Sequence, residues 1–157
     1  MDSTRTRVTV AVPTAARPAS LQRLLAALPA ALGDVICEVL VVDNAPHHPA
    51  ASVAAEAPLP VRYVVEPTPG SAYARNRALD VDSDLVAFLD DDVVPHPGWL
   101  PALLAAFDDP AVVAAGGPKA ETLAEALKLI SDCVTAGGRG VKPASSGRRC
   151  SGWSLTM

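Results

Sequence analysis

The segment Leu85-Val86-Ala87-Phe88-Leu89-Asp90-Asp91-Asp92 carries the strongest information about the fold of this chain. Five consecutive apolar residues predict a short strand that is buried on both faces, as in a parallel sheet. Three aspartates follow directly, and adjacent carboxylates repel one another unless a counter-charge neutralises them. The segment therefore predicts a buried strand with a charged functional group at its carboxyl end.

Similar apolar runs precede this segment, and each is closed by polar or turn-forming residues. They are residues 8–12 closed by Pro13-Thr14, residues 38–42 closed by Asp43-Asn44, and residues 61–65 closed by Glu66-Pro67. A further run at residues 111–115 is a candidate fifth strand.

Segments with helical spacing of apolar residues separate these runs. They lie between Ser20 and Gly33, and over residues 50–57, 71–79 and 99–107. Alternation of strands and helices predicts an α/β fold with an open, mostly parallel sheet and flanking helices. The domain is expected over residues 1–118, with a helical extension over 119–136 and a disordered or aberrant tail over 137–157.

The strand ends are expected to meet at one edge of the sheet, where ligands bind in folds of this class. That edge would gather Thr14, Asp43, Glu66 and the run of aspartates, with Arg17 nearby. Carboxylates suit a divalent cation, which in turn holds a phosphate. Arg75, on the helix after the third strand, is placed to pair with a phosphate or an acidic neighbour.

Composition excludes several other classes of function. The 157 residues carry a formal net charge of -4, which argues against nucleic acid as a partner. The three cysteines and three histidines lack the spacing of a disulfide framework or a zinc site. No apolar run is long enough for a transmembrane segment and no signal peptide is recognisable, so the expected location is cytoplasmic.

The chain resembles the N-terminal, nucleotide-sugar-binding half of a family 2 glycosyltransferase with the GT-A fold. The resemblance runs over residues 7–118 and rests on the order and spacing of several motifs. They are Val8–Thr14 with Arg17-Pro18, Val41–Asn44, Glu66–Gly70, Ala74–Leu79, Phe88–Asp92, Pro97–Leu100 and Gly116–Pro118.

The resemblance implies a role for each matching residue. Thr14 and Asp43 would contact the nucleotide base, Pro13 would offer its backbone beside Thr14, and Arg75 would help to hold the nucleotide. Asp90 and Asp92 would form the DxD motif that binds Mn²⁺ or Mg²⁺, with Asp92 as the principal ligand and Asp90 nearer the ribose or sugar. Asp91 would fill the middle position.

The implied reaction is inverting transfer of a sugar from a nucleotide-diphosphate sugar donor to the hydroxyl of an unknown acceptor. The family's catalytic base lies well downstream of the DxD motif, and no matching pair of acids occurs here. We therefore expect the acceptor half to be missing and the chain to be truncated. Apolar residues left uncovered, such as Leu123, Leu127 and Ile130, predict self-association or a completing partner chain.

Two alternatives remain open on sequence alone. Asp90 and Asp92 also match the nucleophile motif of a HAD-type phosphatase, although that motif normally follows the first strand. A chain that lacks the catalytic base could instead be an inactive module that binds a nucleotide-sugar without turning it over.

Overall fold

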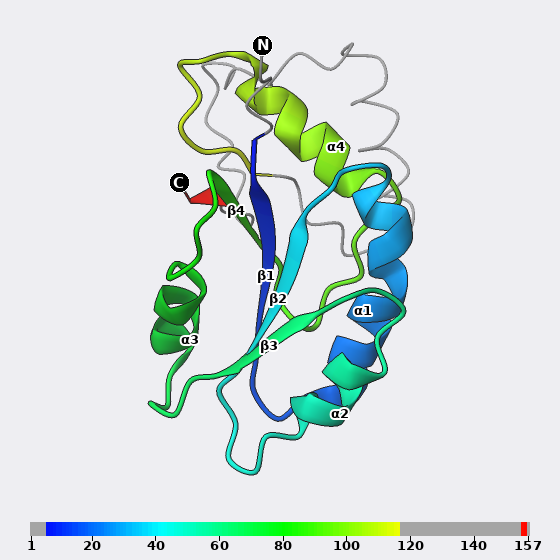
Figure 1. Ribbon diagram of the computed structural model, residues 1–157, viewed down its shortest axis with the longest axis vertical. Coiled ribbons are helices and arrows are strands. Elements are labelled where there is room, and N and C mark those ends of the chain that lie inside the picture. The colour runs from blue at the N-terminus through cyan, green and yellow to red at the C-terminus, as the bar shows by residue number, and fades with distance from the viewer. Residues whose placement is uncertain (1–5, 117–154, 157) are drawn as a thin grey trace, which may run out of the picture.

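The computed structural model describes residues 6–116 and 155–156, which form one sheet with helices on both faces (Figure 1). The strand order is β3-β2-β1-β4-β5. Strands β1 (Val8–Thr14), β2 (Glu38–Asp43), β3 (Arg62–Val65) and β4 (Leu85–Phe88) pair in parallel, and the short β5 (Leu155–Thr156) pairs antiparallel to β4. The predicted mostly parallel α/β sheet is confirmed.

The helices fall where apolar spacing predicts them. They are α1 (Pro18–Leu32), α2 (Ala50–Ala55), α3 (Ser71–Ala78) and α4 (Trp99–Leu104), the last continued by a 3-10 helix, η1 (Ala105–Asp108). Helix α1 begins two residues before the expected Ser20, because proline suits the first turn of a helix, where its missing N–H is not needed. Gly33 ends α1 with a φ of 56°, which glycine adopts without steric cost.

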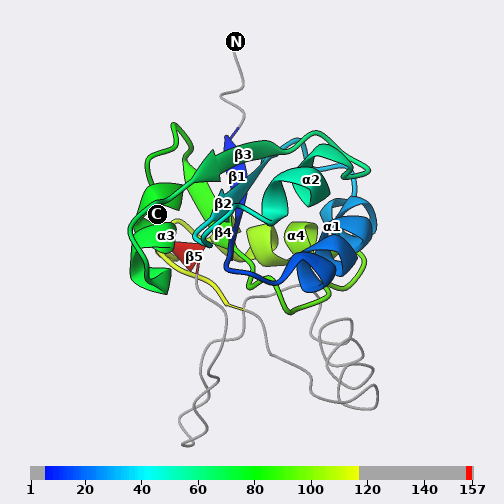
Figure 2. The same cartoon turned by 90° about the horizontal axis from the view of Figure 1, so that it is seen from below.

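The two faces of the sheet are covered unequally (Figure 2). Helices α1, α2 and α4 share one face, and the leucines of α1 pack there against alternate residues of the strands, such as Val10 and Val41. On the other face α3 presents only Ala74 and Ala78 as buried side chains. Small side chains allow α3 to lie close to the sheet, but they bury little apolar area.

Two of the expected strands differ from the structure. The run at 61–65 is not buried on both faces, because β3 is an outer strand, with Arg62 exposed and its other residues half-buried. The run at 111–115 forms no strand at all: its backbone is irregular, and Val113 is exposed. A short apolar run forms a strand only where the edge of a neighbouring strand can pair with it. The spacing of apolar residues in the sequence does not reveal whether such an edge is available.

Several sequence predictions concern residues outside those the structure describes. These are the helical extension at 119–136, with Leu123, Leu127 and Ile130, and nearly all of the tail at 137–157. Among the described residues, no helix has the length and apolar character needed to cross a membrane.

The strand order determines where a ligand can bind. From β1 the chain winds outward to β2 and β3, and then returns to the other side of β1 to form β4. Neighbouring strands with connections that leave in opposite directions open a crevice at their carboxyl ends. In this chain that switch point lies between the ends of β1 and β4.

Candidate functional site

A cavity of about 360 Å³ opens at the switch point between β1 and β4. Its lining residues come from the ends of three strands, the start of α1 and the first turns of α3. They are Pro13, Thr14, Ala15, Arg17, Asn44, Ser71, Ala74, Arg75, Asp90, Asp91 and Asp92. Of the residues expected at this edge of the sheet, Asp43 and Glu66 do not line the cavity, and the others do.

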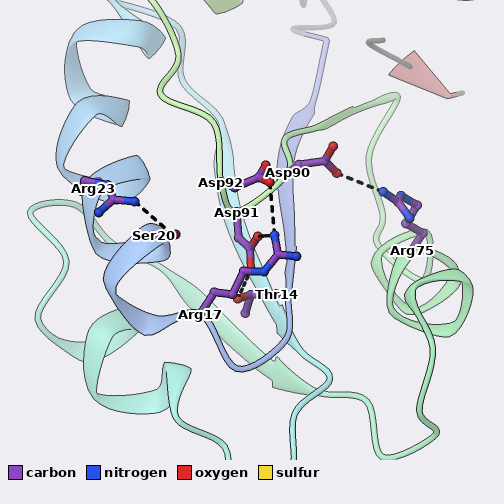
Figure 3. Close-up of polar contacts among 8 residues, drawn as sticks. All are labelled: Thr14, Arg17, Ser20, Arg23, Arg75, Asp90, Asp91 and Asp92. Atoms are coloured by element: carbon purple, nitrogen blue, oxygen red, sulfur yellow. Dashed lines mark hydrogen bonds and ion pairs between the residues drawn. The ribbon is translucent and has the colours of Figure 1, made fainter. Parts of the chain in front are cut away.

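The middle aspartate is the one that the fold encloses. Asp91 is 7% exposed, and its Oδ2 accepts a hydrogen bond of 2.7 Å from the Thr14 hydroxyl (Figure 3). Its Oδ1 accepts a second bond of 3.2 Å from Nη1 of Arg17. A buried carboxylate needs such donors, because burial without them would destabilise the charge. Asp91 thereby connects the end of β4 to the β1–α1 turn.

The two outer aspartates remain accessible and face different arginines (Figure 3). Asp90 is 62% exposed and pairs with Nη2 of Arg75 at 3.0 Å. Asp92 is 51% exposed and pairs with Nη1 of Arg17 at 3.2 Å, so this nitrogen bridges Asp91 and Asp92. Exposed ion pairs of this kind stabilise a fold by at most about 1 kcal/mol, so a ligand can replace them at little cost.

Arg17 is positioned by an unusual turn. Ala16 has a φ of 55°, a left-handed conformation that costs an alanine about 1–2 kcal/mol. The turn links the end of β1 to the first residue of α1 and places the Arg17 guanidinium over the aspartates (Figure 3). Backbone strain is therefore stored at Ala16, between two residues that line the cavity, Ala15 and Arg17.

Asp43 lies beside the cavity but is turned into the protein. Its carboxylate is fully buried and accepts hydrogen bonds from the backbone N–H groups of Ala45 and Ala50, at 3.0 and 3.1 Å, and from the Tyr63 hydroxyl at 2.8 Å. Loss of solvation and the bond to Asp43 raise the pKa of Tyr63 to about 12. In this structure Asp43 fixes the loop after β2.

Asn44, the next residue, is likewise engaged within the chain. Its Nδ2 donates to the carbonyl oxygens of Glu66 and Thr68, at 2.8 and 2.7 Å, and its Oδ1 accepts from the N–H of Gly70 at 2.8 Å. Asn44 therefore ties the end of β2 to the loop that leads into α3. In the sequence, only its position next to Asp43, at the end of a predicted strand, marks Asn44 as a residue of interest.

The acidic residues fit a cation that also receives ligands from its substrate. Among the residues that the structure describes, no three histidine, cysteine, aspartate or glutamate side chains converge as a ready-made metal site. Asp90 and Asp92 nevertheless offer hard carboxylate oxygens in an open cavity. Mg²⁺ is commonly held by one or two carboxylates while water and phosphate fill its other positions. The donor set suits that arrangement and not a closed protein cage.

The fold and the cavity together define an α/β domain with an open cavity at a switch point in strand order, where folds of this class bind ligands. The family model for glycosyl transferase family 2 matches residues 9–132, and the chain belongs to this family. The phosphatase alternative is not favoured by this result.

Among curated proteins, the chain is 37% identical over 122 residues to a pre-mycofactocin glycosyltransferase of Mycobacterium tuberculosis. The aligned region covers 75% of this chain and 24% of the relative. The chain thus spans about a quarter of the length of the curated relatives it matches.

Solved structures confirm the GT-A type of fold. A mannosyltransferase from Pyrobaculum calidifontis in complex with GDP-Man and Mn²⁺ superposes with a TM-score of 0.60 at 25% identity, over 82% of this chain and 39% of that one. A glucosyl-3-phosphoglycerate synthase from Mycobacterium tuberculosis, in complex with Mn²⁺, UDP and glucosyl-3-phosphoglycerate, gives 0.64 at 20% identity, over 96% and 56%. The second likeness bears on the fold alone.

Proposed function

We propose that the cavity binds the diphosphate of a nucleotide-sugar donor together with Mn²⁺ or Mg²⁺, for transfer of the sugar to an acceptor hydroxyl with inversion. The observation that carries this proposal is the mixture of charges in one cavity. Arg17 and Arg75 face the same space as Asp90 and Asp92. A diphosphate bridged to a cation needs both kinds of group, because guanidinium groups pair with its oxygens and carboxylates hold the cation.

Each residue has a role in this proposal. Arg75 pairs with the diphosphate, Asp92 is the principal metal ligand, and Asp90 lies nearer the ribose or sugar. A divalent cation bound there would offset the negative charge that develops on the leaving diphosphate. Pro13 and Thr14 form the wall toward the base.

The contact between Asp43 and the base stays a prediction. Because the Asp43 carboxylate is fully buried, an N–H of the base can reach it only if one of the groups around it moves aside. The Tyr63 hydroxyl is the donor whose release disturbs the backbone least, because the other two donors are main-chain groups.

The proposal assigns the donor side of the reaction to the described residues. Asp90, Asp91 and Asp92 are the only carboxylates among the described residues that line the cavity, and all three already have roles. The base that accepts the proton of the acceptor hydroxyl is therefore sought outside this set. Family membership and the Mn²⁺ and nucleotide-sugar in the related mannosyltransferase structure support the proposal.

Thermal unfolding with UDP, GDP and dTDP, each with and without Mn²⁺, tests donor binding. A nucleotide present at about 100 times its Kd should stabilise the fold by roughly 2.7 kcal/mol. We expect one nucleotide to do so only with Mn²⁺, and Asp92→Ala to abolish the effect. Asp82→Ala, which removes an exposed aspartate at the other end of the sheet, is the matched control. No metal-dependent shift with any nucleotide would refute the proposal.

Incubation with the matching nucleotide-sugar separates transfer from binding alone. Release of the nucleoside diphosphate above the rate without protein would support catalysis by this chain. Stabilisation without release would leave it a donor-binding module.

A further inference from the structure

Arg17 occupies the position from which a cation on Asp92 would be repelled. Its Nη1 lies 3.2 Å from Oδ2 of Asp92, and both side chains are about half exposed. A divalent cation bound to that carboxylate would stand next to a group of the same sign, which opposes its binding. The guanidinium must therefore leave Asp92 before Asp92 can act as a metal ligand.

Asp91 allows Arg17 to do so without leaving the site. The same Nη1 bonds Oδ1 of Asp91 at 3.2 Å, and Asp91 is buried and also held by Thr14. A guanidinium has five N–H donors in a rigid fork, so it can keep one carboxylate while it exchanges another partner. An incoming diphosphate supplies the anion that replaces Asp92.

We propose that Arg17 is a positioning residue that keeps divalent-cation affinity low until a diphosphate arrives. With the cavity empty, Arg17 neutralises Asp92. When the diphosphate binds, the guanidinium turns from Asp92 to a phosphate oxygen, and Asp92 becomes available to the cation. The two ligands thus strengthen each other's binding by the same factor, as thermodynamic linkage requires. The role of the diphosphate rests on the proposed function, whereas the competition at Asp92 does not.

The test is Mn²⁺ binding to the full chain, measured from the electron paramagnetic resonance signal of free Mn²⁺, without nucleotide and then with UDP or GDP. We expect Arg17→Gln to bind Mn²⁺ alone about two- to fivefold more tightly than the wild type, the size typical of a lost exposed charge interaction. The gain that the nucleotide adds should become smaller by a similar factor. Adding Asp92→Ala to Arg17→Gln should remove the tighter binding.

Arg23→Gln is the matched control. Arg23 lies on α1, six residues after Arg17, and its removal changes the net charge equally, but its guanidinium bonds Oγ of Ser20 at 3.1 Å (Figure 3). Arg17→Met provides a second neutral variant if Arg17→Gln fails to fold. Circular dichroism and thermal unfolding establish which variants are folded.

The possible outcomes separate this inference from the proposed function. Tighter Mn²⁺ binding by Arg17→Gln, but not by Arg23→Gln, supports the competition even if no nucleotide binds. Equal or weaker Mn²⁺ binding by the Arg17 variants overturns the inference even if a nucleotide binds well. Failure of every variant to bind Mn²⁺ also overturns it.

Discussion

The β1–β4 pair has a cluster of aspartates and arginine at each end, and only one of them forms a site. At the amino end, Arg7 pairs with Asp82 and Asp84. At the carboxyl end, Arg17 and Arg75 pair with Asp90, Asp91 and Asp92. One arginine with two aspartates and two arginines with three leave the same formal charge of -1 on each cluster.

The two ends differ in how far their aspartates are buried and in whether a cavity lies beside them. The Asp82 side chain is 91% exposed, and Asp84 binds mainly the backbone and guanidinium of its neighbour Arg7. At the other end, Asp91 is buried and anchors Arg17, and a cavity separates Arg17 from Arg75. Charge composition alone therefore does not identify a binding site, whereas a buried acid that orients a cation beside a cavity does.

Removing one acid from each end is the sharpest way to break this comparison. Asp91→Ala leaves the buried Thr14 hydroxyl without its acceptor, so we expect the free energy of unfolding to fall by about 1–3 kcal/mol. Asp82→Ala should change it by less than about 0.5 kcal/mol. Urea unfolding of both variants measures the difference. Equal losses in the two variants would mean that the burial of Asp91 does not increase its contribution to the free energy of unfolding.

A second prediction concerns the buried acid after β2. Tyr63→Phe removes one of three donors to Asp43 and should lower the free energy of unfolding by about 1–2 kcal/mol. Because the pKa of Tyr63 is raised to about 12, the folded protein keeps this proton at a pH where the unfolded chain loses it. The stabilisation is thus present below about pH 10 and is lost as pH rises toward 12.

Unfolding of the wild type and Tyr63→Phe at pH 8 and pH 11 checks the sign of this effect. The wild type should lose more stability than the variant over that interval. A larger loss in the variant would contradict the bond to Asp43.

The strain at Ala16 gives a smaller prediction at the same end. Ala16→Gly should raise the free energy of unfolding by about 0.5–1 kcal/mol, because glycine tolerates the left-handed conformation. Ala15→Gly is the control. Ala15 has no positive φ, so this substitution should lower the free energy of unfolding, because glycine loses more backbone freedom on folding than alanine does. Thermal unfolding distinguishes the two, and a destabilised Ala16→Gly would mean that the turn is not strained.

The weakest effect is expected at the amino end. Hydrogen bonds from the backbone and side chain of Arg7 lower the pKa of Asp84, so this carboxylate stabilises the fold above its ordinary pKa of about 3.9 and the effect is lost below it. Asp84→Asn should therefore lower the free energy of unfolding slightly at pH 7 and leave it unchanged at a pH low enough to protonate the wild-type carboxylate, which flattens the acid side of the stability curve. A large loss at pH 7 would show that this end also has a buried component.

The sequence predicts which residues gather at the site better than it predicts what each one does. Thr14, Arg75 and the aspartates meet as expected, because strand ends in a parallel sheet share one edge. The burial of Asp91 was not predicted, since three adjacent aspartates look equivalent. The internal bonding of Asp43 and Asn44 depends on loops whose paths the sequence does not specify.

One signal for Asp91 was nevertheless present. Along β4, Ala87 and Leu89 face the helices on the α1 side, while Val86 and Phe88 face α3. Successive side chains of an extended chain point to opposite faces. Continued by two residues, the alternation directs Asp90 toward α3 and Arg75, and Asp91 toward α1 and Arg17, as the ion pairs show.

The alanine face of α3 has a consequence for how the protein opens. Helices held by little buried surface are the first to exchange their amide protons with solvent, so α3 should lose protection before α1. The same eight residues carry Arg75 and one wall of the cavity. The affinity for any ligand that contacts Arg75 should therefore weaken with rising temperature ahead of global unfolding, in step with the local opening of α3.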